Sequence, residues 1–172
     1  MYSSLPFRQL RDIIIRGFED LFISNIKNYM STILFLAEDD PLMSRMYERA
    51  FKTNSFDLVI AFDGEEAITK LKSMSPKPTV IMLDVMMPKK SGFDVLREIK
   101  EDGTLKNIPV ILLTNLAGEK DAEKGLELGA VLYLVKSQYS PKETVAKVKE
   151  IIAGYERKEG IPNVEVSVKN TQ

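Results

Sequence analysis

The sequence contains neither cysteine nor histidine. Without cysteine, the chain can form no disulfide and no thiolate metal site, and it has no cysteine nucleophile. Without histidine, it cannot form a Ser-His-Asp triad or a histidine-ligated zinc site, and it cannot carry a phosphohistidine of its own. Any acid–base or metal chemistry must therefore come from carboxylates, lysines and hydroxyls.

An excess of either charge is also missing, because 24 Lys and Arg face 25 Asp and Glu, for a net charge of −1. This balance gives no electrostatic basis for nucleic acid or an anionic membrane as the main partner. No apolar run reaches the ~18 residues that a membrane-spanning helix needs, so stable membrane insertion is not expected. Charged residues such as Arg8, Arg11 and Arg16 interrupt any signal-peptide core. We therefore expect a cytoplasmic protein.

Short apolar runs alternate with amphipathic stretches from residue 32 onward. The runs are rich in Ile, Leu and Val and nearly continuous, which is typical of parallel strands buried on both faces. They cover residues 33–37, 58–61, 80–83, 110–113 and 131–135. The order predicts an α/β fold, a doubly wound sheet of five parallel strands with helices on both faces, or (βα)5.

Start and stop signals for helices lie between the apolar runs. Asp40-Pro41 provides an N-cap followed by a proline at the first helical position. Ser140-Pro141-Lys142-Glu143 forms a complete capping box. Similar starts are expected at Asp63 and Ser91, and helices are expected to end near Gly103, Gly129 and Gly154.

Three segments are expected along the chain: an N-terminal extension (1–31), one domain (32–154) and a flexible C-terminal tail (155–172). The extension has apolar residues at helical spacing, including Leu10, Ile14 and Phe18, so it is expected to form an extra helix. This helix could be an accessory element, the product of an over-long gene start, a docking or dimerisation helix, or a membrane-surface anchor. Whether residues 1–31 belong to the mature protein stays open.

Carboxylates, a hydroxyl and an ammonium follow the apolar runs at Glu38-Asp39, Asp84, Thr114 and Lys136. In a parallel α/β sheet, functional groups gather at the carboxyl ends of the strands. Clustered carboxylates can hold a hard cation such as Mg²⁺, and a carboxylate can attack phosphorus to form an aspartyl phosphate. Each residue alone has an ordinary structural explanation, but the combination predicts phosphoryl transfer to a carboxylate.

Residues 32–154 resemble the receiver domain of two-component response regulators, in its stand-alone, CheY-like form. The resemblance rests on the acidic pair Glu38-Asp39 and on Asp84 within Asp84-Val85-Met86-Met87-Pro88. It also rests on the spacing of the residues that follow Asp84, which are Gly92, Thr114, the Leu128-Gly129-Ala130 motif and Lys136. The resemblance implies a flavodoxin-like fold.

The resemblance assigns metal-binding and phosphorylation roles to the residues of this chain that match the family's motifs. The resemblance implies that Asp84 is the phosphoacceptor in a phosphorelay. It implies that Asp39 and Asp84 bind Mg²⁺ or Mn²⁺ directly, together with the Met86 main-chain carbonyl. Glu38 would act mainly through metal-bound water, and Lys136 would pair with the phosphoryl group.

The resemblance also implies a switch rather than an enzyme, catalysing only its own phosphoryl transfer and dephosphorylation. Thr114 and Tyr133 would be the switch pair, which remodels a face made of the fourth helix (from about Glu119), the fifth strand and the fifth helix (Pro141 to Ala153). The implied partners are a sensor histidine kinase or phosphotransfer protein and a downstream protein target. Only about 18 residues follow the last helix, so the output is expected through another protein or a homodimer.

The chain departs from the family pattern near the site. Ser137 follows Lys136 where the family usually has proline, often after a cis peptide, so the geometry of this loop is open. Asn115 replaces a small residue and is expected to narrow access to the phosphoryl group. Met86 and Leu116 are apolar at two positions that influence the phosphoryl lifetime. Because neither can orient water, we expect slow self-dephosphorylation.

Two rival functions are weighed against the switch. A haloacid-dehalogenase-like phosphatase also uses an aspartate nucleophile, but it needs a second aspartate two residues later, where this chain has Met86. A degenerate receiver that acts as a constitutive scaffold would usually lack an acidic ligand, the acceptor or the lysine. All of these are retained here.

Overall fold

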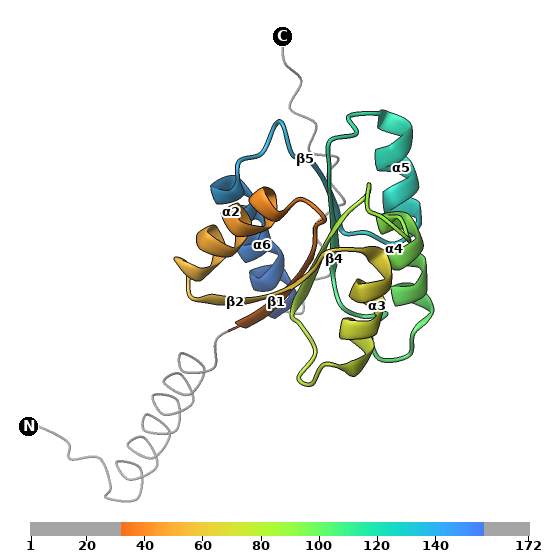
Figure 1. Cartoon of the computed structure of the whole chain (residues 1–172), viewed down its shortest axis with the longest axis horizontal. Coiled ribbons are helices and arrows are strands. Elements are labelled where there is room, and N and C mark those ends of the chain that lie inside the picture. Colours follow the sequence, from red (N-terminus) through yellow and green to blue (C-terminus); the bar gives the residue numbers. More distant parts are fainter. Residues whose placement is uncertain (1–31, 157–172) are drawn as a thin grey trace, which may run out of the picture. The chain divides into compact units, whose positions relative to one another are not determined.

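The structure is a computed structural model that describes residues 32–156. Within these residues, five parallel strands form one sheet in the order β2-β1-β3-β4-β5, and five helices connect and follow them (Figure 1). The predicted doubly wound sheet is therefore confirmed, whereas the expected N-terminal helix and most of the expected tail lie outside the described residues. The elements are β1 (Thr32–Ala37), α2 (Pro41–Lys52), β2 (Phe56–Ala61), α3 (Gly64–Ser73), β3 (Val80–Asp84), α4 (Gly92–Glu101), β4 (Val110–Thr114), α5 (Glu119–Glu127), β5 (Leu132–Val135) and α6 (Pro141–Glu156).

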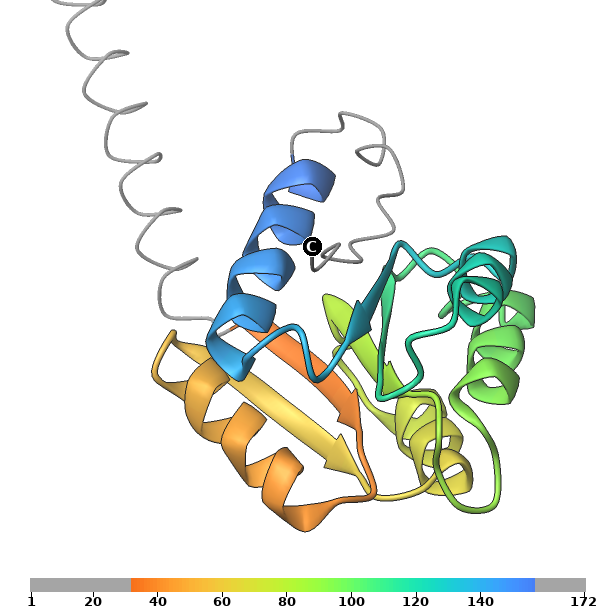
Figure 2. The same ribbon diagram turned by 90° about the horizontal axis from the view of Figure 1, so that it is seen from above.

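Helices cover both faces of the sheet, and successive strand residues point to opposite faces. Helices α2 and α6 lie on one face, and α3, α4 and α5 lie on the other (Figures 1 and 2). In β1, Leu34 and Leu36 pack into the core beneath α2 and α6, while Phe35 and Ala37 pack into the core beneath the other three helices. Strands β3 and β4 are buried along their whole length, which explains their continuous apolar sequence.

The predicted helix starts are confirmed. The Asp40 side chain accepts a hydrogen bond from the Leu42 N–H at 2.7 Å. At the start of α6, the Ser140 N–H donates to Glu143 Oε2 at 2.9 Å and the Glu143 N–H donates to Ser140 Oγ at 3.3 Å, which completes the capping box. Within residues 32–156, no helix is long and apolar enough to cross a membrane.

The predicted helix ends are only partly correct. Gly129 follows α5 with a φ of +95°, the left-handed conformation that favours glycine after a helix. Gly154, however, lies inside α6, which continues to Glu156 instead of ending at Ala153. An interior glycine costs about 1 kcal/mol relative to alanine. The preceding turns are anchored by buried Val148 and Ile151, and this packing carries the helix through the glycine.

Strands β2, β3 and β4 extend beyond the predicted apolar runs because flanking residues continue the pairing. Strand β2 begins at Phe56 rather than at residue 58, because Phe56 and Asp57 pair with the start of β1. Asp84 and Thr114 are the last residues of β3 and β4 and pair with Leu113 and Val135 of the next strands. These two polar side chains are thus fixed in the sheet rather than carried on a loop.

Candidate functional site

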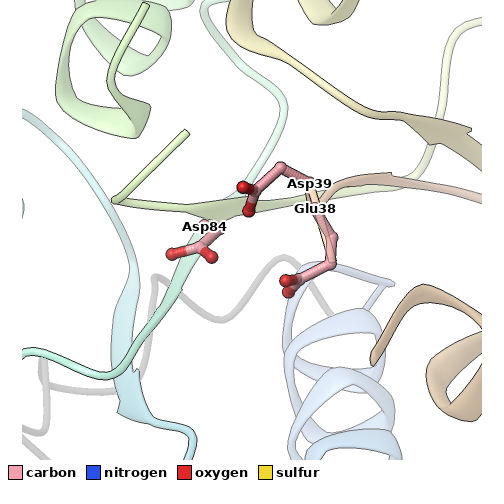
Figure 3. A group of neighbouring side chains, drawn as sticks. All are labelled: Glu38, Asp39 and Asp84. Atoms are coloured by element: carbon pink, nitrogen blue, oxygen red, sulfur yellow. The ribbon is translucent and has the colours of Figure 1, made fainter. Parts of the chain in front are cut away.

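Three carboxylates meet at the carboxyl edge of the sheet (Figure 3). Ala37 of β1 pairs with Leu83 of β3, so the residues that follow, Glu38 and Asp84, lie at the same level on neighbouring strands. One carboxylate oxygen from each of Glu38, Asp39 and Asp84 lies within 4.8 Å of the others. The structure therefore brings together the three acidic residues that the sequence placed at the ends of two different strands.

Lys136, the residue after β5, pairs with two of these carboxylates. Its Nζ lies 2.6 Å from Asp84 Oδ2 and 2.5 Å from Glu38 Oε2, and its side chain is only 5% exposed. Burial acts to lower the pKa of Lys136, but the bonds to Asp84 and Glu38 outweigh burial and raise it. Burial raises the pKa of Glu38, although Lys136 opposes this shift. The lysine is therefore a charged group inside the site.

The donor set fits a hard divalent cation. Three carboxylates and one ammonium leave an excess of two negative charges when all are ionised. Apart from its ion pair with Lys136, the buried Glu38 Oε2 accepts no hydrogen bond from the residues that the structure describes. Asp39 is exposed, so the cluster opens to solvent on one side. Carboxylate oxygens with access to water are the ligands that Mg²⁺ prefers.

Asp84 is also held by the chain that follows it. The Met86 N–H donates to Asp84 Oδ1 at 3.0 Å, while Lys136 occupies Oδ2. Both carboxylate oxygens are therefore engaged, which offsets part of the cost of burying the charge. This contact places the Met86 main chain beside Asp84. The part that the Met86 carbonyl takes in metal binding remains a prediction.

The proposed switch pair is linked through the loop after β4. Thr114 is fully buried, and its Oγ1 accepts a hydrogen bond from the Leu116 N–H at 3.1 Å. The Tyr133 hydroxyl donates to the Leu116 carbonyl at 3.0 Å. The Tyr133 side chain is 1% exposed, and burial raises its pKa to about 12. The tyrosine is thus a neutral phenol that faces inward and contacts Thr114's loop rather than solvent.

The unusual Ser137 causes no departure from trans geometry. Among the described residues, the only cis peptide joins Ser75 and Pro76, so Lys136–Ser137 is trans. The Gln138 N–H donates to the Val135 carbonyl at 2.9 Å and closes a tight turn. This turn carries Lys136 into the site without the proline of the family pattern. Asn115 has an exposed side chain, and its effect on access to the site remains a prediction.

Sequence reasoning missed Tyr47, a buried residue of α2. Its hydroxyl is shielded from solvent and faces the Thr144 side chain of α6. Burial raises the pKa of Tyr47, and it interacts electrostatically with Lys136, Glu38 and Asp84. In the sequence, Tyr47 lies on the apolar face of an amphipathic stretch, where a tyrosine looks like any other core residue.

Comparisons with known proteins agree with this geometry. The family model described as "Response regulator receiver domain" matches residues 34–149. The chain belongs to the response-regulator receiver family. It is 39% identical over 113 residues to response regulator Rcp1 of Synechocystis sp., covering 62% of this chain and 77% of Rcp1. It is 34% identical over 119 residues to the probable transcriptional regulator ycf27 of Porphyridium aerugineum, covering 69% of this chain and 47% of that protein.

Solved structures agree with the family. The receiver domain of the Francisella response regulator 1452 has a TM-score of 0.67 and 28% identity, and the match covers 73% of this chain and 99% of that domain. The protein is thus a receiver of two-component signalling, whose family function is to accept a phosphoryl group. The chain spans about half the length of ycf27 and similar curated relatives. Since ycf27 is described as a transcriptional regulator, the absence of a nucleic-acid partner remains a prediction from charge alone.

Proposed function

We propose that the protein is a Mg²⁺-dependent switch in which Asp84 is the phosphoacceptor and the output is a contact with another protein. The observation that carries the proposal is the buried Asp84 carboxylate, 2.6 Å from Lys136 and beside Glu38 and Asp39. A buried ion pair alone is a poor source of stability. Carboxylates that the lysine does not neutralise repel one another and destabilise the fold unless a cation binds. The arrangement therefore favours a functional site over a purely structural ion pair.

Asp39 and Asp84 would hold Mg²⁺ or Mn²⁺ directly, with the Met86 main-chain carbonyl as a third ligand and Glu38 acting through water. When bound, the cation neutralises charge that builds on the oxygens of the transferred phosphoryl group. The carboxylate cluster supplies negative charge that attracts the cation to this edge of the sheet. The remaining chemistry belongs to Asp84, Lys136 and Thr114.

The transfer step forms one bond and breaks another. A carboxylate oxygen of Asp84 attacks phosphorus, and the bond from phosphorus to the donor nitrogen breaks, with the electron pair staying on nitrogen. This chain would act in the cytoplasm, and the donor would be the phosphohistidine of a sensor histidine kinase or phosphotransfer protein. Lys136 then pairs with a phosphoryl oxygen, and the Thr114 hydroxyl donates to another. The chain changes only its own phosphorylation state, so it acts as a switch rather than as an enzyme.

The signal would pass from Thr114 to Tyr133 through Leu116. If the Thr114 hydroxyl turns toward the phosphoryl group, it no longer accepts from the Leu116 N–H, and the loop that supports the Tyr133 hydroxyl changes. This loop leads into α5. The surface formed by α5, β5 and α6, the fourth helix, fifth strand and fifth helix of the predicted domain, would then bind the target, which is another protein or a second copy of the chain.

The phosphorylated state would be long-lived. Met86, whose side chain is 61% exposed, and Leu116 are the apolar side chains at the two lifetime positions. Neither has a polar atom in its side chain that could orient a water molecule for attack on the aspartyl phosphate. An aspartyl-phosphate lifetime of only seconds in vitro would contradict this proposal.

The direct test is phosphorylation by acetyl phosphate, measured as the mass of the intact protein. The wild-type chain should gain one phosphoryl group in the presence of Mg²⁺, and EDTA should abolish the gain. Asp84→Asn, which keeps the size of the side chain but is not a carboxylate, should show no gain. If the wild-type chain binds the cation but gains no mass, the proposal is contradicted and the site is occluded or degenerate, with Asn115 and Ser137 the first residues to vary.

A further inference from the structure

The loop between β3 and α4 (residues 85–91) is held by the start of a different helix. Gly64, the first residue of α3, donates its N–H to the Pro88 carbonyl at 3.3 Å. A Cβ on Gly64 would lie 2.3 Å from the Lys90 carbonyl oxygen and 2.6 Å from Lys90 Cβ. Such distances are far below van der Waals contact, so the close approach of loop and helix requires glycine at this position.

Asp63 adds a second contact to the same loop. Its Oδ1 caps α3 by accepting from the Glu66 N–H at 2.8 Å, and its Oδ2 pairs with Lys89 Nζ at 2.6 Å. Lys89 has a φ of +66°, a conformation that costs a residue with a side chain roughly 1–2 kcal/mol. The cap and the ion pair lower the pKa of Asp63, and Asp63 raises the pKa of Lys89. A strained backbone persists only where its surroundings hold it.

The other side of the loop is tied to the phosphorylation site. The Met86 N–H donates to Asp84 Oδ1 at 3.0 Å, and the Gly92 N–H donates to the Val85 carbonyl at 2.9 Å. The loop thus spans from the acceptor to α3 and carries Met86 between the two attachments. Met86 cannot shift its main chain without straining one of them.

We propose that Asp63, Gly64 and Lys89 are positioning residues for the divalent cation. By fixing the β3–α4 loop against α3, they hold the Met86 main-chain carbonyl where the cation at Asp39 and Asp84 can reach it. None of the three touches the cation itself. This inference rests on the proposed metal-dependent function and adds to it the part of the fold that sets the affinity for the metal.

A purely electrostatic role of Lys89 makes the opposite prediction. A lysine ammonium repels a nearby dication, so removing its charge would tighten cation binding if charge were all that mattered. If Lys89 acts by holding the loop, its removal weakens binding instead. The Lys89 side chain is 54% exposed, so Lys89→Gln should leave the fold intact. The sign of this single change distinguishes the two explanations.

The experiment is a Mn²⁺ titration of the full chain, followed by the EPR signal of the free aquo ion, with Mg²⁺ competition. Gly64→Ala should weaken binding about tenfold, the lower range for residues that support metal ligands. Lys89→Gln should weaken it about threefold, the size expected of an exposed ion pair. Gly103→Ala is the matched control, because a Cβ there meets no atom within 4 Å. It should bind as the wild-type chain does.

Circular dichroism and melting in EDTA accompany each titration, because a general loss of structure would lower both stability and affinity. Lys89→Gln should melt as the wild-type chain does while binding Mn²⁺ more weakly. If Gly64→Ala does not fold, the Mn²⁺ affinity of Lys89→Gln alone tests the inference. Unchanged or tighter binding by Lys89→Gln overturns this inference and leaves the proposed function standing. A wild-type chain that binds no Mn²⁺ overturns both.

Discussion

Helices α4 and α5 lie side by side on the same face of the sheet (Figures 1 and 2). They differ, however, in how much of each helix is buried and in how each helix is capped. Five of the ten residues of α4 are buried, including the large side chains Phe93, Leu96 and Ile99. Only two of the nine residues of α5 are buried, and both are small, Ala122 and Gly125. The Ser91 side chain caps α4, whereas α5 begins after Gly118 with no side-chain cap.

The difference in packing between α4 and α5 corresponds to the loop that precedes each helix. Helix α4 comes after the loop that follows Asp84, the proposed acceptor, and its deep packing anchors the far end of that loop. Helix α5 follows the loop that links Thr114 to Tyr133, and weakly packed elements are those that move at low cost. A firmly packed α4 beside a weakly packed α5 fits the switch that we propose. One contact joins the two helices, since Lys124 Nζ of α5 lies 4.3 Å from the centre of the buried Phe93 ring of α4.

The largest effect should come from removing matched leucines from the two helices. Leu96→Ala in α4 leaves a cavity in the core and should lower the free energy of unfolding by about 2–5 kcal/mol. Leu126→Ala in α5 removes a partly exposed side chain and should cost less than about 1.5 kcal/mol. Urea unfolding of both variants measures the difference. Equal losses in the free energy of unfolding would show that α5 packs against the sheet as tightly as α4 does.

A high-pH titration tests how deeply Tyr133 lies beneath α5. Because burial raises its pKa to about 12, the folded and unfolded states both hold the proton below pH 10. Between pH 10 and 12 the unfolded state loses it first, so stability should fall by up to about 2 kcal/mol. Tyr133→Phe should show a shallower fall over this range. An identical fall in the variant would mean that Tyr133 does not contribute.

Adding a side-chain atom between α5 and the sheet should destabilise the packing of this helix. A Cβ on Gly125 would lie 2.5 Å from Leu112 Cδ1 and 3.3 Å from Tyr133 Cδ2. Gly125→Ala should therefore lower stability by about 1 kcal/mol, the cost of overpacking minus the gain in helix propensity. Gly103→Ala, in open space, is the control. A stabilised Gly125→Ala variant would show that α5 can relax away from the sheet without cost.

The smallest effects concern the helix starts. Ser91→Ala removes the cap of α4 and should cost about 1 kcal/mol. Gly118→Ser introduces a capping hydroxyl on α5 and should gain only a few tenths of a kcal/mol, since glycine is already a tolerable cap. Thermal melting of both variants tests whether Ser91→Ala lowers the stability and Gly118→Ser raises it. A loss in Gly118→Ser would indicate that the hydroxyl finds no free N–H at the start of α5.

The sequence predicts most of the fold because its signals are local. The buried strands are continuous apolar runs, and the caps at Asp40 and Ser140 lie next to the helices that they start. The candidate site was also predictable, because residues at the ends of parallel strands must share one edge of the sheet. For Asp84 and Lys136, 52 residues apart, the structure shows the expected contact at 2.6 Å.

What could not be predicted depends on contacts between distant segments. Gly64 looks like an ordinary glycine at a helix start, and only the fold shows that a loop some 25 residues later packs against it. Tyr47 shares the apolar face of its helix with core residues, so its buried hydroxyl beside the site leaves no mark in the sequence. Gly154 resembles a helix end, and only the packing of α6 explains why the helix continues.

The central claim is that phosphorylation of a fixed Asp84 moves α5 and leaves α4 in place. Hydrogen–deuterium exchange of the chain with and without acetyl phosphate and Mg²⁺ tests it directly, with Asp84→Asn as the control. We predict altered exchange in α5 and β5, unchanged exchange in α4, and no response in the variant. Equal changes in both helices, or the same response in Asp84→Asn, would contradict the account.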